Sequence, residues 1–526
     1  MNSLKIKSTE ITYPYRLSRH SKRNNSSIRI KDDEKFFEDD NNYIDYFLEI
    51  GIKPEIFKED FLYSSSLDDL NQKLNPQIIS KFPDLNKNSI VINSKLIEQI
   101  VANRFKVIEA KDKPDTTFYA IILDNQLYSV KYKYKYLSCL IIYESIGDYR
   151  KLYNKYFNKE DDDKNKDSNY NDFYIPKCLC IASVHPCIDK FEEILKTIYE
   201  ETMSNKYYNI FLNQLIHELI IKTPKIPLGY KKVLLKLKEK TIELTEKKIN
   251  EYPLIHVDLT KLFGLFNLNN LLDIFKYILF EGNLIFFSKK IYDLTNSIMS
   301  FLFLLSPFKF QYQVISVLPK EYYSYMEADI PFIFGINQSY NPNFFTDNNI
   351  NLRKKIVCIV DLDEKNYEFI PKNYNTKENP DFPKNIKDRI DNKIQEYYKR
   401  LIAQATKGLD KNENKKNEKN KNKENNPNKS QNITEEKNEQ YQIIFYKFMV
   451  EILEEYPKYL KKDINIKNIR DMEIGDLIDI NLYLNTFNTI DREFYKKLFK
   501  TKMFKEFISK RVETRNNKEK IEVIFF

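Results

Sequence analysis

The chain is 526 residues long, more than one hydrophobic core normally holds, and this length suits two or three domains. Its apolar content of 42% is enough for globular cores, and its net charge of +9 is modest. Only 8 glycines are present, and neither a GxGxxG nor a GxxxxGKS/T loop occurs. The sequence therefore argues against an NTPase or a dinucleotide-binding enzyme.

The N-terminal segment is strongly basic. Residues 1–31 hold eight Lys and Arg against one acidic residue, a net charge of +7. This composition predicts a disordered arm over residues 1–42, and it also suits an arm attracted to an anionic membrane surface, where each basic residue contributes about 1 kcal/mol. Few aromatic residues accompany the basic ones and no recognition motif follows them, so we expect no nucleic acid partner.

Residues 43–158 are the first segment with the composition of an ordered domain. Three runs of apolar and aromatic residues predict strands, and Asp124-Asn125 between the first two indicates a hairpin. These runs are Tyr119–Leu123, Gln126–Val130 and Leu137–Tyr143. The charged residues 159–172 that follow predict a linker.

A second ordered segment covers residues 173–371. Apolar residues at helical spacing precede the short apolar run Leu284–Phe287, which predicts a buried strand. A further helix is predicted over Asp293–Leu305, and a further strand over Tyr312–Leu318. A helix that connects two strands is the unit of a buried parallel sheet, so we predict an α/β fold.

The rest of the chain, residues 372–512, has mainly helical periodicity. Residues 405–440 are rich in Asn, Lys and Glu with almost no apolar side chains, which predicts a disordered insert. After this insert, Ile444 and Phe448 share one helix face. Residues 513–526 are predicted to be a tail.

The cysteines indicate neither a disulfide framework nor a metal site. The count of five is odd and no apolar signal-peptide core is present, so we expect a reducing, cytoplasmic environment. Cys178, Cys180, His185 and Cys187 are residue types that bind zinc, but their spacing is poor because the chain turns after the Cys-x-Cys strand. We therefore predict no metal and no other cofactor.

Candidate binding residues lie at one strand end and in one loop. Asp361 and Asp363 end the apolar strand Ile356–Val360, and carboxylates at the carboxyl end of a strand in an open α/β sheet lie where ligands bind. A turn cap is an equally good interpretation of Asp361. The loop around Gly335 supplies the other candidates, which are Pro331, Phe332, Gly335 and Asn337.

The central segment resembles the DENN domain of Rab GTPase exchange factors. The resemblance rests on the order and wording of four stretches: Leu279–Ser288, Pro307–Gln311, Val317–Pro319 and Asp329–Ile336. Where the family usually has a tryptophan before the glutamine, this chain has Phe310. The chain contains no tryptophan at all, so this departure reflects its composition.

Further stretches extend the resemblance over roughly residues 43–512. They are Tyr46–Gly51, Ile79–Pro83, Phe118–Tyr128, Tyr174–Ser183, Thr223–Gly229, Ile356–Asp363 and Leu498–Ile508. The resemblance implies an upstream segment over 43–158, a central one over 173–371 and a downstream one over 372–512. It also implies an N-terminal longin-like lobe and a larger α/β lobe, whose mixed sheet is flanked by helices.

The resemblance implies a guanine nucleotide exchange factor for a Rab-family small GTPase. Such a factor acts in vesicle-mediated transport, from the cytoplasm and with transient membrane association. It makes no covalent bond, because it releases GDP by binding the empty GTPase more tightly than the loaded one. The candidates for this GTPase contact are the six residues around Gly335 and Asp361 that are named above.

Two alternatives share the same fold. The first is a DENN-fold scaffold that binds Rab proteins without exchanging nucleotide. The second is a GTPase-activating protein built on longin and DENN modules. That activity needs an arginine finger, and Arg353 is the first candidate.

Overall fold

The computed structural model describes most of the ordered part of the chain. The described residues are 44–52, 71, 75–82, 97, 100–101, 105–124, 134–145, 173–183, 187–203, 216, 219–220, 232–237, 240–245, 257–352, 355–372, 374, 379–413, 427–461, 464, 469 and 472–516. The predicted basic arm over residues 1–42 and the predicted linker over 159–172 lie outside them.

The fold divides into two compact units. The division follows contacts and not simple chain order, because both units take up pieces of the N-terminal part of the chain. The first unit comprises residues 1–90, 106–116 and 135–248, and the second comprises residues 91–105, 117–134 and 249–526.

An antiparallel sheet forms the centre of the first unit. Its strands follow the order β2-β1-β6-β5, and β3 pairs with the start of β6. The strands are β1 Tyr46–Gly51, β2 Gln77–Phe82, β3 Ile108–Glu109, β5 Tyr134–Ser145 and β6 Phe173–Ser183. Because β6 is buried along nearly its whole length, its sequence is a mostly continuous apolar run and not an alternating one.

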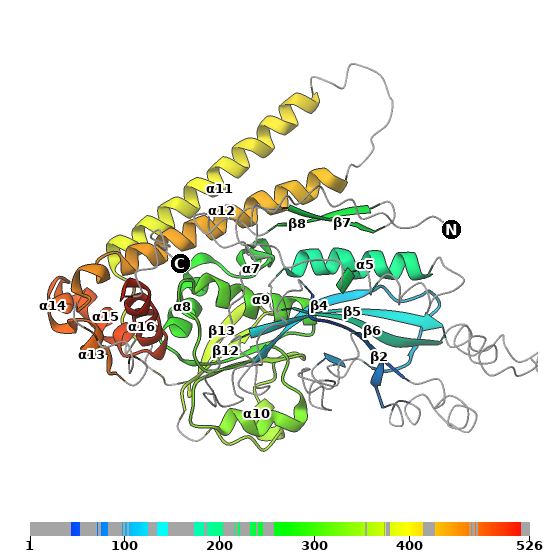
Figure 1. Ribbon diagram of the computed structural model, residues 1–526, viewed down its shortest axis with the longest axis horizontal. Helices are drawn as coiled ribbons and strands as arrows, with labels where there is room; N and C mark the ends of the chain where they lie inside the picture. The colour runs from blue at the N-terminus through cyan, green and yellow to red at the C-terminus, as the bar shows by residue number, and fades with distance from the viewer. Residues whose placement is uncertain are drawn as a thin grey trace, which may run out of the picture. The chain divides into compact units, whose positions relative to one another are not determined.

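Helix α5 (Ile188–Met203) packs on β6 through buried apolar residues at helical spacing. These residues are Phe191, Ile194, Leu195 and Ile198. A hairpin of β7 (Lys232–Leu237) and β8 (Lys240–Thr245) contacts α5, so that the helix lies between the hairpin and the sheet, as Figure 1 shows.

The strand predictions for the N-terminal part are confirmed where the structure describes them. Leu137–Tyr143 lies within β5, and Tyr119–Leu123 lies within β4 (Thr117–Asp124), whose residues belong to the second unit. The predicted strand Gln126–Val130 lies outside the described residues, so the predicted hairpin stays a prediction.

The second unit is built on a mixed sheet of order β10-β11-β9-β12-β13. Every neighbouring pair in it is parallel except β12 and β13, which are antiparallel. The strands are β9 Asn283–Phe287, β10 Gln313–Ile315, β11 Phe332–Ile336, β12 Val357–Asp361 and β13 Asn366–Ile370. The predicted α/β class is confirmed, and the strand predicted over Tyr312–Leu318 is shorter than expected.

Two different layers cover this sheet. Helix α9 (Ile291–Leu304) contacts β9 and β11 on one face, where Phe301 lies 5.8 Å from Phe286, ring centre to ring centre. The other face forms a core with the 3-10 helix η3 (Lys320–Glu327) and the short helix α10 (Phe344–Asp347). Figure 1 shows α10 on the opposite side of the sheet from α8 and α9.

The remaining helices of the second unit flank this core. They are α7 Leu259–Leu265, α8 Leu268–Leu279, α11 Lys384–Glu413, α12 Pro427–Leu453, η5 Tyr456–Tyr459, α13 Ile474–Leu477, α14 Ile480–Asn485, α15 Thr489–Phe499 and α16 Lys502–Asn516. Helices α11 and α12 contact each other, and α12 packs on α7 through Tyr441, which stacks on Phe263 at 4.0 Å. No helix in the described part of the chain is both long and apolar enough to cross a bilayer.

The structure differs from the predicted disorder of residues 405–440. Residues 405–413 belong to α11 and residues 427–440 to α12, whereas 414–426 lie outside the described residues. The composition indicates only that few side chains here are apolar. It does not exclude a helical backbone, because Lys, Glu and Gln are good helix formers without an apolar face. Residues 513–516, which were predicted to be part of the tail, belong to α16, because this helix extends to Asn516.

Candidate functional site

Polar residues follow three neighbouring parallel strands of the second unit. The strands β11, β9 and β12 lie side by side and run in the same direction, so their carboxyl ends meet at one edge. Ser288 follows β9, Asn337 follows β11, and Asp361 ends β12, two residues before Asp363. We call these four residues the carboxyl-edge site. Ligands of open α/β sheets bind outside this edge.

Asp363 is the exposed carboxylate of the site. Its Oδ1 accepts a hydrogen bond from Ser288 Oγ at 2.8 Å, and its Oδ2 accepts one from the backbone N–H of Lys289 at 3.0 Å. Ser339 Oγ donates a longer bond of 3.4 Å to the same Oδ2. Donors from the loops after β9 and β11 therefore hold the carboxylate in one orientation.

Asn337 connects the ends of β9 and β11. Its Nδ2 donates to the carbonyl oxygens of Ser288 at 2.9 Å and of Lys289 at 3.1 Å. In return, the N–H of Ser288 donates to the carbonyl of Ile336 at 3.2 Å. These bonds continue the pairing of the two strands beyond their ends, so the loops that follow leave the sheet from a fixed position.

Asp361 is buried and caps the turn between β12 and β13. Its Oδ1 accepts hydrogen bonds from the backbone N–H groups of Asp363 at 3.0 Å and Glu364 at 3.1 Å. The turn also contains Lys365 in the left-handed conformation, with φ at 56°. The turn-cap interpretation of Asp361 therefore agrees with the geometry, and this carboxylate acts by fixing the loop that presents Asp363.

A half-buried tyrosine packs beside the site. Tyr340 packs against Phe287 at the end of β9, and its hydroxyl donates to Glu368 Oε1 at 2.6 Å. Burial, this hydrogen bond and the negative charge of Asp361 raise the pKa of Tyr340 well above its usual range. The phenol therefore stays protonated and remains a hydrogen-bond donor at any physiological pH.

The other candidates from the sequence lie elsewhere in the sheet. Phe332 begins β11 at its amino end, is fully buried, and stacks on Phe334 with ring centres 4.4 Å apart. Pro331, which precedes it, is half-buried. An added Cβ at Gly335 would lie 2.1 Å from the carbonyl oxygen of Ser316, so this glycine is required by close backbone packing. The six predicted residues therefore do not form one surface.

The carboxyl-edge site lies in a region of the chain that matches a known protein family. The family model described as the DENN (AEX-3) domain matches residues 174–365. This range begins in β6, ends in the turn after β12, and includes every residue of the carboxyl-edge site. The chain contains a DENN domain.

Curated relatives match the DENN-domain chain over short stretches. DENN domain-containing protein 2A of Mus musculus is 27% identical over 171 residues, which is 32% of this chain and 17% of that protein. Two fungal proteins named Elicitor of plant defense protein 1, from Verticillium dahliae and Gibberella zeae, are each 31% identical over 140 residues. That stretch is 26% of this chain and 12% of each fungal protein. The chain thus matches less than a fifth of these relatives' own lengths.

Ser288 belongs to the carboxyl-edge site, although the sequence had not indicated it as a candidate. Ser288 donates to Asp363 and also accepts a hydrogen bond from the N–H of Lys290 at 3.0 Å. Its signal in the sequence is its place as the first polar residue after the apolar run Leu284–Phe287. What the sequence could not indicate is that this strand end lies beside the turn that carries Asp363.

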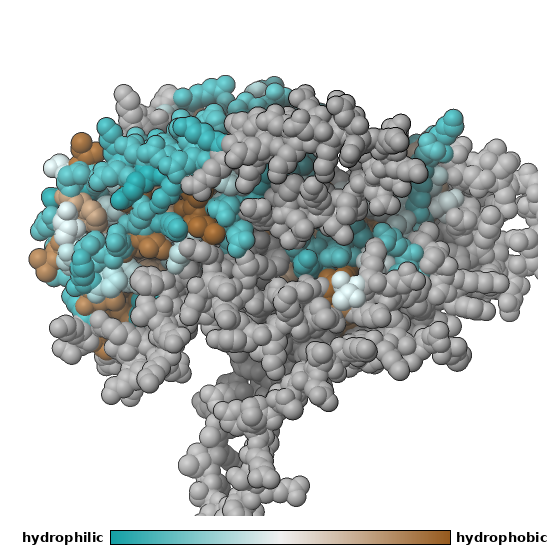
Figure 2. All heavy atoms as spheres, turned by 90° about the horizontal axis from the view of Figure 1, so that it is seen from above, coloured by the Kyte–Doolittle hydropathy of each residue, from teal (hydrophilic) through white to brown (hydrophobic). Residues whose placement is uncertain are grey.

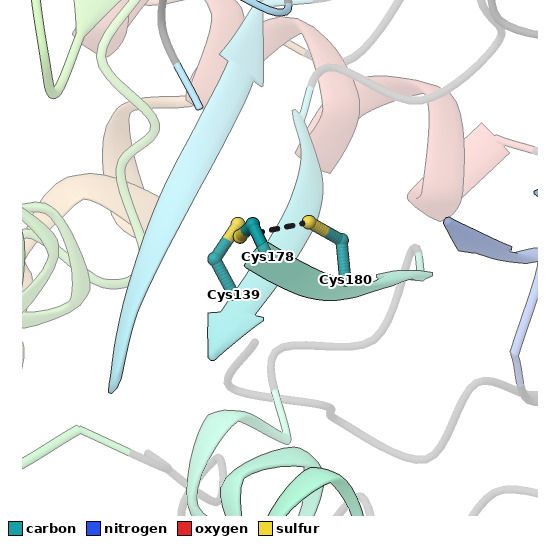
Figure 3. Close-up of side chains that lie close together, drawn as sticks. All are labelled: Cys139, Cys178 and Cys180. Atoms are coloured by element: carbon teal, nitrogen blue, oxygen red, sulfur yellow. Dashed lines mark hydrogen bonds between the residues drawn. The ribbon is translucent and has the colours of Figure 1, made fainter. Parts of the chain in front are cut away.

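Three buried thiols form the only group of metal-type side chains found in the described part of the chain. Cys178 and Cys180 are two residues apart on β6, and Cys139 of β5 is paired in register with Cys180. Their Sγ atoms all lie within 4.8 Å of one another, and Cys178 and Cys180 are 3.4 Å apart (Figure 3). His185 lies outside the described residues.

These three donors could hold a soft metal ion, but their surroundings oppose it. Metals bind the thiolate, and burial raises the pKa of Cys180 well above its usual range, as do its contacts with the other two thiols. Their burial and the hydrogen bonds between the neutral thiols are what core side chains of a sheet would show. The prediction that the chain uses no metal stays a prediction.

Proposed function

We propose that the chain is a guanine nucleotide exchange factor for a Rab-family small GTPase and that it promotes GDP release in membrane trafficking. The observation that carries this proposal is the DENN-domain match over residues 174–365, because DENN domains are typical of Rab exchange factors. The chain itself makes no covalent bond in this proposal. It works by binding one state of the GTPase better than another.

Exchange of this kind is a linkage between two binding equilibria. A factor that binds the empty GTPase more tightly than the GDP-bound one weakens GDP binding by the same ratio. Each tenfold weakening needs about 1.4 kcal/mol of differential contact. The relevant residues are those whose positions are fixed before the partner arrives, because a preorganised surface loses less entropy on binding.

Asp363 and Asn337 meet this requirement in the carboxyl-edge site. Donors from two loops orient the carboxylate of Asp363, and Asn337 holds the exits of β9 and β11 together. Exposed Lys289 and Glu364 beside them add charges of both signs. We assign this edge, rather than the buried Phe332, to the GTPase contact.

The proposal also assigns roles to the parts of the chain on either side of the matched region. The antiparallel sheet of the first unit supports a longin-like lobe over residues 43–158, and the helices after β13 support a downstream DENN segment over residues 372–512. The net charge of residues 1–31 supports recruitment from the cytoplasm to an anionic membrane. The GTPase-activating alternative has no such support, because Arg353 lies outside the described residues.

The experiment is a release assay with fluorescent GDP across a panel of purified Rab proteins. We expect the full chain to accelerate release at least tenfold from one Rab or a small group of them. Asp363→Ala should remove most of this acceleration, whereas Asp388→Ala, an exposed carboxylate on α11, should retain it. No acceleration from any Rab, or full activity in Asp363→Ala, would contradict the proposal.

A further inference from the structure

A second concave surface lies among the C-terminal helices of the second unit. It is a hollow of about 650 Å³ between α13, α14, α15 and the start of α16, and it shares no residue with the carboxyl-edge site. We call it the C-terminal groove. Its volume falls in the range of pockets that bury a small ligand or several side chains, about 300–1,000 Å³.

The floor of the groove is apolar and firmly packed. Ile480 and Leu484 are one helical turn apart on α14, and they line the hollow together with Phe499 of α15. Phe499 stacks on Tyr483 at 5.0 Å and on Phe504 at 4.5 Å, ring centre to ring centre. An occupant would therefore meet a preformed floor and not a surface that must rearrange.

The rim of the groove is basic. Four lysines line it. Lys496 pairs with Glu493 at 2.6 Å, whereas the side chains of Lys500, Lys502 and Lys505 form no ion pair in the part of the chain that the structure describes. The ammonium of Lys502 lies 5.5 Å from the ring centre of Tyr312, which is a cation–π contact and not an ion pair. The acidic residues of the rim do not offset these charges.

Both carboxylates of the groove already have partners. Glu506 pairs with Lys510 at 3.1 Å, and Glu473 accepts the N–H of Asp476 in a capping box. Positive charge therefore exceeds negative charge at this rim.

The backbone at the start of α16 is also satisfied within the chain. Glu281 at the end of α8 accepts hydrogen bonds from the N–H groups of Lys502 at 2.9 Å and Met503 at 2.7 Å. The free N–H groups of this helix end are thus not available to an anion. Recognition at the groove must come from the three lysine side chains and the apolar floor.

Apolar side chains are also exposed on two of the helices that line the groove. Leu482 of α14 is 58% exposed and Ile490 of α15 is 84% exposed. Figure 2 shows hydrophobic side chains among hydrophilic ones over the end of the second unit where α13, α14 and α15 lie. An apolar floor, a basic rim and exposed apolar side chains on the lining helices are together the features of a protein-binding groove.

We propose that the C-terminal groove binds an acidic amphipathic peptide segment of a partner protein. Apolar side chains of the segment enter the hollow over Ile480, Leu484 and Phe499, and flanking Asp or Glu residues pair with the three lysines of the rim. A flat anionic membrane would satisfy the lysines but leave the hollow unfilled, so the shape of the groove favours a peptide. The proposal does not depend on exchange activity.

The test begins with selection of random 12-residue peptides, displayed on phage, against the full chain. We expect enrichment of peptides that combine Asp or Glu with at least two large apolar residues. Selected peptides, labelled with a fluorophore, are then titrated against three variants. In the groove variant, Lys500→Gln, Lys502→Gln and Lys505→Gln, affinity should fall at least tenfold, and a similar fall is expected for Leu484→Ser.

The matched control removes the same charge elsewhere. Lys384→Gln, Lys399→Gln and Lys458→Gln change three exposed lysines outside the groove, and this protein should bind like the wild type. If Leu484→Ser fails to fold, the lysine variants still decide the matter, because they change only rim side chains. Selection of no acidic apolar peptide, or equal affinity of the groove and control variants, would overturn the proposal. So would phosphatidylserine vesicles that bind through the three lysines when no peptide does.

Discussion

The carboxyl-edge site and the C-terminal groove both present charged side chains of the second unit, but the fold uses them differently. At the edge, Asp363 accepts hydrogen bonds from Ser288 and Lys289, and Asp361 accepts two from its own turn. In the groove, the ammonium groups of Lys500, Lys502 and Lys505 pair with no carboxylate among the described residues.

This difference separates two kinds of functional residue. A carboxylate that connects loops contributes to stability and to binding together, because removing it leaves N–H groups without an acceptor. A surface lysine that no carboxylate engages contributes almost nothing to stability, so its substitution affects only what binds there. Measurements of stability and binding on the same variants test whether the two regions differ in this way.

The largest effect is expected at Phe332, which the sequence suggested as a contact residue and the structure places in the core. Phe332→Ala should lower the free energy of unfolding by about 3–5 kcal/mol, because it leaves a cavity under Phe334. Urea denaturation measures this loss. Ile330→Ala, two residues earlier and 48% exposed, is the control and should change stability little. Equal losses of stability from the two substitutions would contradict the burial of Phe332.

Glu281→Ala should have the next largest effect. The carboxylate accepts two N–H groups at the start of α16, a helix that begins 221 residues later in the chain. Losing it should cost about 2–3 kcal/mol, since both donors lose a charged acceptor. Glu281 has a φ of 57°, and Ala is equally strained there, so the substitution isolates the side chain. Unchanged urea stability would show that the cap contributes nothing.

Asp363→Ala should lower stability by about 1–2 kcal/mol, because the Ser288 hydroxyl and the Lys289 N–H lose their acceptor. Asp363→Asn retains one side-chain oxygen and should cost less, while losing the charge that we assign to the GTPase contact. Thermal unfolding compared with GDP release distinguishes these contributions. If the loss of GDP-release activity in each variant only follows its loss of thermal stability, the carboxyl-edge site has a structural role and does not contact the GTPase.

The smallest effect is expected in the groove. The three Gln substitutions at Lys500, Lys502 and Lys505 should change the free energy of unfolding by no more than about 0.5 kcal/mol. The measurement is the same urea titration, with the control lysine variant beside it. A loss of more than about 2 kcal/mol would mean that the rim is part of the fold, and the contrast with the edge would disappear.

Local patterns predicted the central elements well. The apolar run Leu284–Phe287 and the helical spacing over Asp293–Leu305 correspond to β9 and α9 within one or two residues. Both segments are buried, so their patterns reflect packing directly. Asn337, Asp361 and Asp363 at the ends of β11 and β12 were also selected from the sequence, the two aspartates because ligands of open α/β sheets bind at such strand ends, whereas Ser288 after β9 was not.

Features that depend on distant partners were not predictable. The burial of Phe332 follows from its place at the start of β11, which requires knowing where the strand begins. Cys139 meets Cys178 and Cys180 only through the register of β5 on β6. The cap that Glu281 provides to α16 joins residues that no local pattern relates. The helical parts of residues 405–440 were missed because composition reports burial and not backbone conformation.

The central claim is that this DENN-domain chain prefers the empty form of its GTPase. The most direct test measures its affinity for the cognate Rab in the nucleotide-free and the GDP-loaded state, by surface-immobilised binding at fixed salt. We expect at least tenfold tighter binding of the nucleotide-free form, which corresponds to about 1.4 kcal/mol of differential contact. Equal affinity for the two forms would contradict this claim and would leave a Rab-binding scaffold without exchange activity.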